Sequence, residues 1–192
     1  MAAGNVGVGR EELGGERRSH VVRVGLPAPY FDGQAYVNGE IRDLSLDDYR
    51  GKTVVLVFYP LGFTFVCPTE LHAFARDLDR FRELRAEVVA VSVDSIHSHK
   101  AWFARAAGRA LPGAVGHHEV DHPRLRGARA DPGGGAPRHV HYRPQGIVRY
   151  QVVSALNLGR STDETFRTLQ ALHMSGLCPV DWRPGQPTLG KG

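Results

Sequence analysis

The sequence predicts an α/β fold, because strand patterns alternate with helix patterns along the chain. Residues 53–59 form a continuous β-branched and aromatic run, as expected for a strand that is buried on both faces. Residues 68–84 follow with apolar side chains at every third or fourth position, which is typical of a helix with one face on a sheet. A second apolar strand is predicted over 88–93. This alternation favours helices packed on a partly parallel sheet.

The remaining elements extend the same pattern. Residues 95–103 predict the opening of a further helix, and 147–153 predict another strand. Ser161 and Glu164 form a capping box that starts a helix ending near Met174. We expect residues 1–20 to be a flexible tail, followed by a single domain over 21–192 whose last part, 175–192, is a C-terminal tail. A chain of 192 residues that is 42% hydrophobic is large enough for one such core.

Composition narrows the classes of function. The longest apolar stretches span about six residues, so the sequence predicts no helix that crosses a membrane and no membrane partner. The first twenty residues lack an apolar region of the secretory type, so we expect a cytoplasmic protein. Two cysteines, Cys67 and Cys178, do not make a disulfide scaffold.

The net charge of +4 and the pI near 9.3 would alone suggest a nucleic-acid partner. The excess of positive charge is confined to residues 105–143, which hold seven arginines and three acidic residues. The rest of the chain holds 17 basic and 17 acidic residues and is neutral. We therefore expect no nucleic-acid partner.

Cys67 is the first candidate functional residue, because it lies between the predicted strand and the predicted helix. Free backbone N–H groups and the positive end of the helix dipole at this place favour a thiolate over a thiol. The nearby hydroxyl of Thr64 could orient an oxygen-containing substrate. A buried structural cysteine is the alternative interpretation, and residue types alone leave both open.

The stretch FYPLGFTFVCPTE at 58–70 is the longest of seven that carry a family resemblance. It resembles the active-site loop of the typical two-cysteine peroxiredoxins, the alkyl hydroperoxide reductase and thiol-specific antioxidant family. The resemblance covers about 21–104 and 144–192 and implies a thioredoxin-like fold. The other six stretches are 24–31, 44–52, 91–95, 98–102, 157–165 and 177–185.

The resemblance implies an antioxidant enzyme that reduces hydrogen peroxide and organic hydroperoxides through cysteine. Cys67 matches the peroxidatic cysteine, whose thiolate takes one peroxide oxygen and becomes a sulfenic acid. Thr64 would hydrogen-bond the peroxide, and Pro60 would shield the site from bulk water. Glu70 and Arg160 match an ion pair that, in the family, supports the active-site arginine and positions the active-site loop.

Cys178 matches the family's resolving cysteine, which forms a disulfide with the peroxidatic cysteine of a second subunit. The resemblance thus implies a homodimer and allows a ring-shaped decamer. Thioredoxin or an AhpF-like flavoprotein disulfide reductase would restore the thiols. No organic cofactor and no metal is implied.

Residues 105–143 depart from the family and are expected to be irregular, because they lack periodicity and contain three consecutive glycines at 133–135. We interpret this segment as frameshifted. In the shifted frame, residues 115–128 can be re-read as SDITKSITRDYGVL and 136–143 as LRGTFIID, and both strings resemble the family. The active-site arginine would then come from the codon that overlaps Pro137, and Arg138 is not assigned its role.

Two alternative functions remain at this point. His118 and His122 complete an H-E-x-x-H pattern, the zinc-protease motif, but Pro123 disfavours the helix that would bring both imidazoles to one face. The pattern is better explained as an accident of the shifted frame. The second alternative is a catalytically impaired relative of the peroxiredoxins that has only an assembly or holdase role.

Overall fold

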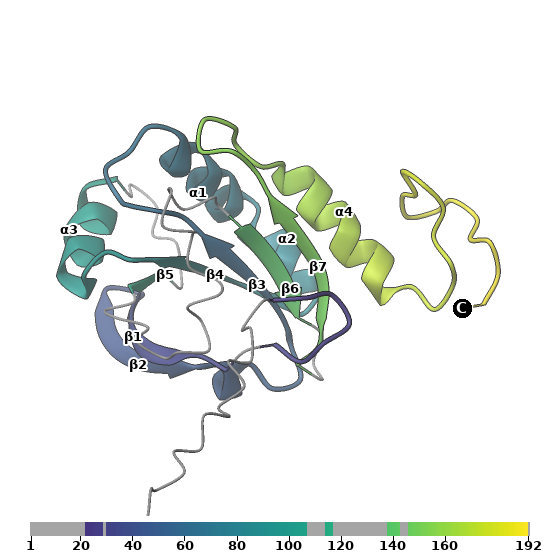
Figure 1. The fold of residues 1–192 in the computed structure, drawn as a ribbon, viewed down its shortest axis with the longest axis horizontal. Helices are drawn as coiled ribbons and strands as arrows, with labels where there is room; N and C mark the ends of the chain where they lie inside the picture. Colours follow the sequence, from purple (N-terminus) through teal and green to yellow (C-terminus); the bar gives the residue numbers. More distant parts are fainter. Residues whose placement is uncertain (1–21, 29, 107–113, 117–137, 143–145, 192) are drawn as a thin grey trace, which may run out of the picture.

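A seven-stranded mixed sheet forms the centre of the molecule, in the order β2-β1-β5-β4-β3-β6-β7 (Figure 1). The computed structural model describes residues 22–28, 30–106, 114–116, 138–142 and 146–191. Strands β3, β4 and β5 are mutually parallel, whereas the other neighbouring strands pair antiparallel, so the predicted α/β class is confirmed. The strands are β1 (Asp32–Val37), β2 (Glu40–Ser45), β3 (Thr53–Phe58), β4 (Ala86–Ser92), β5 (Ala114–Gly116), β6 (Arg138–Tyr142) and β7 (Val148–Val153).

Strand β3 is buried on both faces, as its apolar run predicts. Val55 and Val57 belong to one hydrophobic cluster, and Val54 and Leu56 belong to another. Successive side chains of a strand point to opposite faces of a sheet, so these two clusters lie on the two sides of β3. The sheet therefore has two cores.

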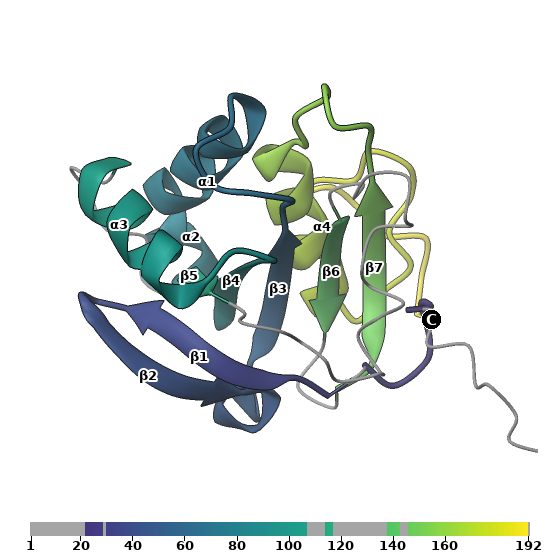
Figure 2. The ribbon, with the colours of Figure 1, turned by 60° about the vertical axis from the view of Figure 1, so that its left-hand side comes forward.

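Four helices cover one face of the sheet (Figures 1 and 2). They are α1 (Val66–Arg76), α2 (Leu78–Glu83), α3 (Ile96–Ala106) and α4 (Thr162–His173). Each contributes to the cluster that contains Val55, through Leu71, Phe81, Trp102 and Leu169 in turn. The cluster on the other face contains side chains of residues 22–31 and of the β1–β2 hairpin, with the 3-10 helix Leu46–Tyr49 beside it.

The single helix predicted over 68–84 is wrong in one respect, because the structure divides it at Asp77. This residue has φ −96° and ψ 8°, outside the helical range, and it separates α1 from α2. Its carboxylate accepts hydrogen bonds from the Arg76 guanidinium, which lower the pKa of Asp77, and it also pairs with Arg80. The apolar stripe survives the break, since Phe74 and Phe81 are both buried and their rings pack together.

The β1–β2 hairpin has no counterpart in the sequence-based prediction. Asn38 and Gly39 join its strands, with φ of 52° and 93°. Both central residues of a type I′ turn need positive φ, and Asn-Gly is the preferred pair there. The dipeptide could therefore have indicated the hairpin. The predicted N-cap of α4 is confirmed, because the Ser161 hydroxyl accepts from the Glu164 backbone N–H at 3.1 Å. The second half of the predicted capping box is not formed, since the Glu164 carboxylate accepts from Arg167 instead.

The expectation that all of 105–143 is irregular is wrong for β5 and β6. Strand β6 pairs antiparallel with β3 on one side and with β7 on the other. Such ladders satisfy backbone N–H and C=O groups whatever the side chains are, which is why a weakly apolar sequence still fits between two strands. Residues 105–106 end α3, and the rest of the segment, including the His118–His122 motif and Pro137, lies outside the described residues, as does the predicted tail over 1–20.

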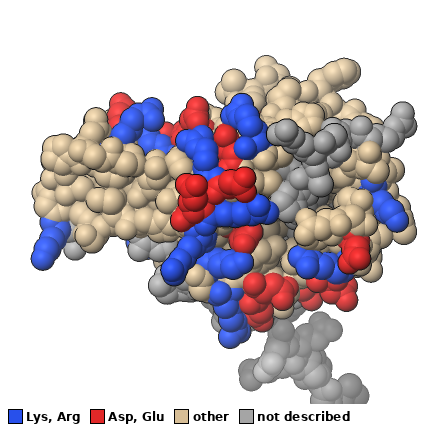
Figure 3. Space-filling view, turned by 180° about the vertical axis from the view of Figure 1, so that it is seen from behind, with Lys and Arg blue, Asp and Glu red and all other residues tan. Residues whose placement is uncertain are grey.

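The face opposite to that of Figure 1 carries both signs of charge in alternation (Figure 3). Ion pairs between exposed side chains include Arg80 with Asp163 at 3.7 Å and Arg82 with Asp79 at 3.1 Å. Within the described ranges, no helix combines the length and apolarity that crossing a membrane requires.

We expect a chain with the restored reading of 105–143 to be more stable than the chain as written. The re-read strand contains Phe-Ile-Ile where 140–142 now hold Val, His and Tyr, so it adds apolar area at a central position of the sheet. A gain of several kcal/mol would raise the melting temperature by about 10 °C. Thermal unfolding followed by circular dichroism measures this, and peroxide consumption should rise in parallel. Equal melting temperatures and equal rates would contradict the frameshift interpretation.

Candidate active site

The first turn of α1 places Cys67 directly after the loop that follows β3. The thiol is 5% exposed and packs in the helix-side cluster with Tyr59 and Leu71. Pro68 fits this turn because a residue in the first turn of a helix needs no intrahelical partner for its N–H. The position predicted for Cys67 is confirmed.

The start of α1 leaves backbone donors close to the thiol. The N-cap residue is Phe65, 95% exposed, whose side chain has no acceptor with which to cap the helix. Backbone N–H groups of a first turn have no intrahelical acceptor, and the dipole of an 11-residue helix adds partial positive charge there. This end of α1 can therefore stabilise negative charge that develops on an oxygen bound beside Cys67.

Thr64 and Pro60 lie in the loop 60–65 that leads into α1, and both are half-buried. The Thr64 hydroxyl donates to the Leu61 carbonyl oxygen at 3.2 Å. Its oxygen keeps lone pairs for accepting a hydrogen bond, whereas donation to a peroxide requires the hydroxyl to turn away from Leu61. The roles of Thr64 and Pro60 stay predictions.

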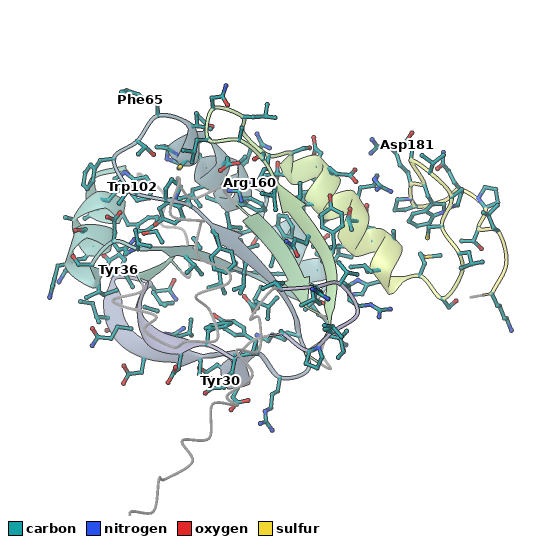
Figure 4. All side chains as sticks on the ribbon, viewed as in Figure 1. Tyr30, Tyr36, Phe65, Trp102, Arg160 and Asp181 are labelled. Carbon is teal, nitrogen blue, oxygen red and sulfur yellow. The ribbon has the colours of Figure 1, made fainter. Side chains whose placement is uncertain are left out.

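The same loop is attached to the start of α3. The Gly62 backbone N–H donates to the Asp94 carboxylate, and the Phe63 ring packs on Trp102, which Figure 4 labels, with centroids 6.2 Å apart. Phe63 has φ 54°, in the left-handed region that bulky residues rarely adopt. The loop therefore has a strained conformation that contacts from another element maintain.

A buried polar network lies behind this loop. Tyr59 Oη is 2.9 Å from His99 Nδ1, and His99 Nε2 is 3.1 Å from Ser92 Oγ. Burial raises the pKa of Tyr59 above its usual range, so its hydroxyl keeps its proton and shares one hydrogen bond with Nδ1. Burial also lowers the pKa of His99 to about 4, so the imidazole is neutral at neutral pH and one of its two ring nitrogens donates while the other accepts.

Glu70 and Arg160 form the buried ion pair that joins α1 to the segment before α4. Arg160 Nε and Nη2 lie 2.8 and 2.7 Å from the two carboxylate oxygens, and the Arg160 backbone N–H donates to Oε1 at 2.6 Å. The two side chains are only 3% and 1% exposed. Arg160 Nη1 is buried without a hydrogen-bond partner among the described residues. The structure thus brings together two residues that are 90 positions apart, as the resemblance implies.

A cavity of about 440 Å³ opens beside Arg160, between β7 and the start of α4. Its walls include Tyr150, Val152, Leu158 and Glu164. Cys67 does not line it, so this cavity is separate from the thiol.

Cys178 lies in the C-terminal tail, beyond α4, and both cysteines are free thiols (Figures 1 and 4). Its Sγ is half-buried and lies 3.8 Å from the carbonyl oxygens of Ala171 and Gly176. The tail folds around the buried Trp182, whose Nε1 donates to the Gln186 carbonyl oxygen at 3.0 Å.

Arg167 of α4 fixes this tail to the domain. Its Nη1 donates to the Trp182 carbonyl oxygen at 3.1 Å, while Nε and Nη2 hold the Glu164 carboxylate at 2.6 and 2.7 Å. These hydrogen bonds lower the pKa of Glu164 and keep it charged. Neither Arg167 nor Trp182 is among the residues for which the sequence predicts a role.

A central sheet with helices on one face, and a cysteine in the first turn of the helix after a central strand, define a thiol protein of the thioredoxin-like class. Residues 24–151 match the model of the AhpC/TSA family, which is two thirds of the chain, and the chain belongs to this family. The family recognised from sequence motifs is therefore confirmed.

Several relatives support this assignment. The chain is 41% identical over 183 residues to the human mitochondrial thioredoxin-dependent peroxide reductase, covering 88% of this chain and 70% of that protein. It is 41% identical over 175 residues to a protein of Clostridium pasteurianum named as a peroxiredoxin in the rubredoxin operon, covering 86% and 98%. Among solved structures, the reduced 2-Cys peroxiredoxin of Plasmodium vivax matches with a TM-score of 0.76 and 31% identity, covering 86% and 91%.

We expect Glu70→Gln to lower the free energy of unfolding by about 3–5 kcal/mol, because it leaves the buried Arg160 charge without its counter-ion. Glu87→Gln is the matched control, since its pair with Lys52 is partly exposed, with side chains 33% and 47% accessible, and should contribute less than about 1 kcal/mol. Urea unfolding of both variants measures the difference. Equal effects of the two substitutions would contradict a structural role for the buried pair.

Proposed function

We propose that the chain is a thiol peroxidase that reduces hydrogen peroxide and organic hydroperoxides, with Cys67 as the attacking residue. The observation that carries this proposal is the thiol of Cys67 in the first turn of α1, within the segment most similar to the family's active-site loop. The relatives named as peroxide reductase and peroxiredoxin favour an active enzyme over the impaired alternative.

The Cys67 thiolate attacks one oxygen of the peroxide, and the O–O bond breaks as the S–O bond forms. The departing oxygen takes a proton and leaves as water or an alcohol, while the sulfur is oxidised to sulfenic acid. The free N–H groups and dipole of α1 stabilise the negative charge during this transfer. Thr64 binds the peroxide and Pro60 limits access of water.

The Cys178 thiolate then attacks the sulfenic sulfur, and water leaves as the disulfide forms. We assign this bond to two subunits of a homodimer, which is supported by the position of the C-terminal tail beyond α4 (Figure 1). A thioredoxin-type reductase restores the two thiols by disulfide exchange. The human relative is named as thioredoxin-dependent, which supports thioredoxin rather than a flavoprotein as the reductant of this chain.

A cycle that starts from two free thiols needs a reducing compartment, which supports the cytoplasm as the place of action. The proposed chemistry needs only cysteine and peroxide, with no cofactor or metal. Among the described residues, no three His, Cys, Asp or Glu side chains are grouped as a metal site would need.

We expect Cys67→Ser to abolish peroxide reduction, because a serine hydroxyl is almost never ionised near neutral pH and attacks peroxide poorly. Stopped-flow measurement with hydrogen peroxide gives the rate, and circular dichroism confirms that the variant is folded. Full activity in the folded variant would remove Cys67 from its role.

Cys178→Ser should leave the first attack intact and stop turnover with thioredoxin. Cys67 would then accumulate as sulfenic acid, which dimedone traps for mass spectrometry. In the parent chain, peroxide should produce a dimer band on non-reducing electrophoresis that contains both cysteines. A disulfide within a single chain would contradict the assignment to two subunits.

A further inference from the structure

We propose that Asp94 is a positioning residue that holds the loop 60–65 closed in front of Cys67 and thereby limits how fast this thiol reaches Cys178. This proposal rests on the proposed roles of the two cysteines. Asp94 itself touches the loop and not the sulfur, so it acts through the position of the loop.

The need for an opening step follows from burial. Cys67 is 5% exposed within the hydrophobic cluster, and Cys178 lies in the tail beyond α4. A disulfide requires Cβ atoms about 4 Å apart, so the Cys67 side chain must leave the cluster before it can pair. The loop 60–65 leads directly into the turn that holds this side chain, so its position controls the opening.

Asp94 and Trp102 bind this loop in the closed position. Asp94 accepts the Gly62 N–H, a charge-assisted hydrogen bond, and Trp102 packs on the next residue, Phe63. Phe63 has a φ of 54°, and strained conformations of this kind persist only where surrounding contacts impose them. Loss of the Asp94 bond therefore removes a contact that opposes relaxation of the loop.

The fit between Gly62 and Asp94 is close. A Cβ atom at Gly62 would lie 3.1 Å from Asp94 Oδ2 and 3.4 Å from the Trp102 ring. Because glycine has no side chain, the loop backbone at Gly62 can approach the Asp94 carboxylate and the Trp102 indole at the same time. This contact holds the loop, whereas the Glu70–Arg160 pair holds α1 from Glu70 onward, so the loop and the first turn with Cys67 can move while that pair stays intact.

A rigid network supports the carboxylate. The Asp94 backbone N–H donates to Ser92 Oγ at 3.0 Å, and Ser92 contacts His99, which in turn contacts Tyr59. Tyr59 is the last residue before the loop, and Gly62 is three residues further on. The network thus ties the start of the loop and its middle to the same place in the fold, so Asp94 cannot follow the loop when it moves.

The test uses Cys178→Ser as a background, in which Cys67 is the only thiol of the chain. We measure the rate of Cys67 alkylation by iodoacetamide in the reduced protein, without peroxide. We expect Asp94→Ala to raise this rate about tenfold, because a charge-assisted hydrogen bond that favours the closed loop is lost. Asp94→Asn keeps an oxygen that can accept from Gly62, so its rate should rise only about threefold.

Asp79→Ala is the matched control, because this exposed aspartate pairs with Arg82 in α2 and does not contact the loop. Its alkylation rate should equal that of the background, and thermal unfolding is recorded for every variant. A rate for Asp94→Ala within twofold of the background would overturn the proposal. An equal increase in Asp79→Ala, or equal increases in the Asn and Ala variants of Asp94, would also overturn it, since general destabilisation would then explain the result.

A second measurement uses chains that retain Cys178. After mixing with hydrogen peroxide, Asp94→Ala should form the disulfide about tenfold faster and accumulate less Cys67 sulfinic acid at excess peroxide than the parent. Faster alkylation with unchanged disulfide formation would overturn the link between the loop and resolution. If no variant consumes peroxide, the proposed function fails, while the alkylation rates still report whether Asp94 holds the loop.

Discussion

The buried Glu70–Arg160 ion pair is the interaction on which the geometry around Cys67 depends. It joins the first turns of α1 to the segment before α4 through two side-chain bonds and one backbone bond. Burying two charges is costly unless both are paired and hydrogen-bonded, so the pair tolerates few alternative arrangements. It therefore holds α1, and the cysteine in its first turn, at one place over the end of β3.

The loop before Cys67 has the opposite character. Its backbone is strained at Phe63, and contacts from α3 and from Asp94 maintain its closed conformation. A peroxidase cycle needs both properties, because the attack on peroxide requires an ordered site while disulfide formation requires the thiol to leave it. Two adjacent segments meet these two requirements. The Glu70–Arg160 pair keeps α1 ordered after Cys67, and the strained loop 60–65 precedes Cys67.

Strand β6 illustrates how far backbone pairing can compensate for an unfavourable sequence. Two neighbouring strands supply hydrogen-bond partners along both of its edges, so its backbone is satisfied although residues 138–142 include two histidines and an arginine. Apolar contacts contribute most of the stability of a buried strand, and they depend on side chains. The same strand can thus be present in the fold and still lower its stability.

The sequence by itself determined the elements with strong local patterns: the apolar run of β3, the cap of α4 at Ser161, and the position of Cys67 at a helix start. These patterns can be read from the sequence because periodicity and capping involve residues only a few positions apart. The pairing of Glu70 with Arg160 was predicted from the resemblance to the family. The tertiary structure alone decided the break at Asp77, the network from Tyr59 through His99 to Asp94, and the attachment of the tail by Arg167. The network and the tail attachment join residues from different elements, and the apolar stripe runs through Asp77 without interruption, so no local pattern specified these features.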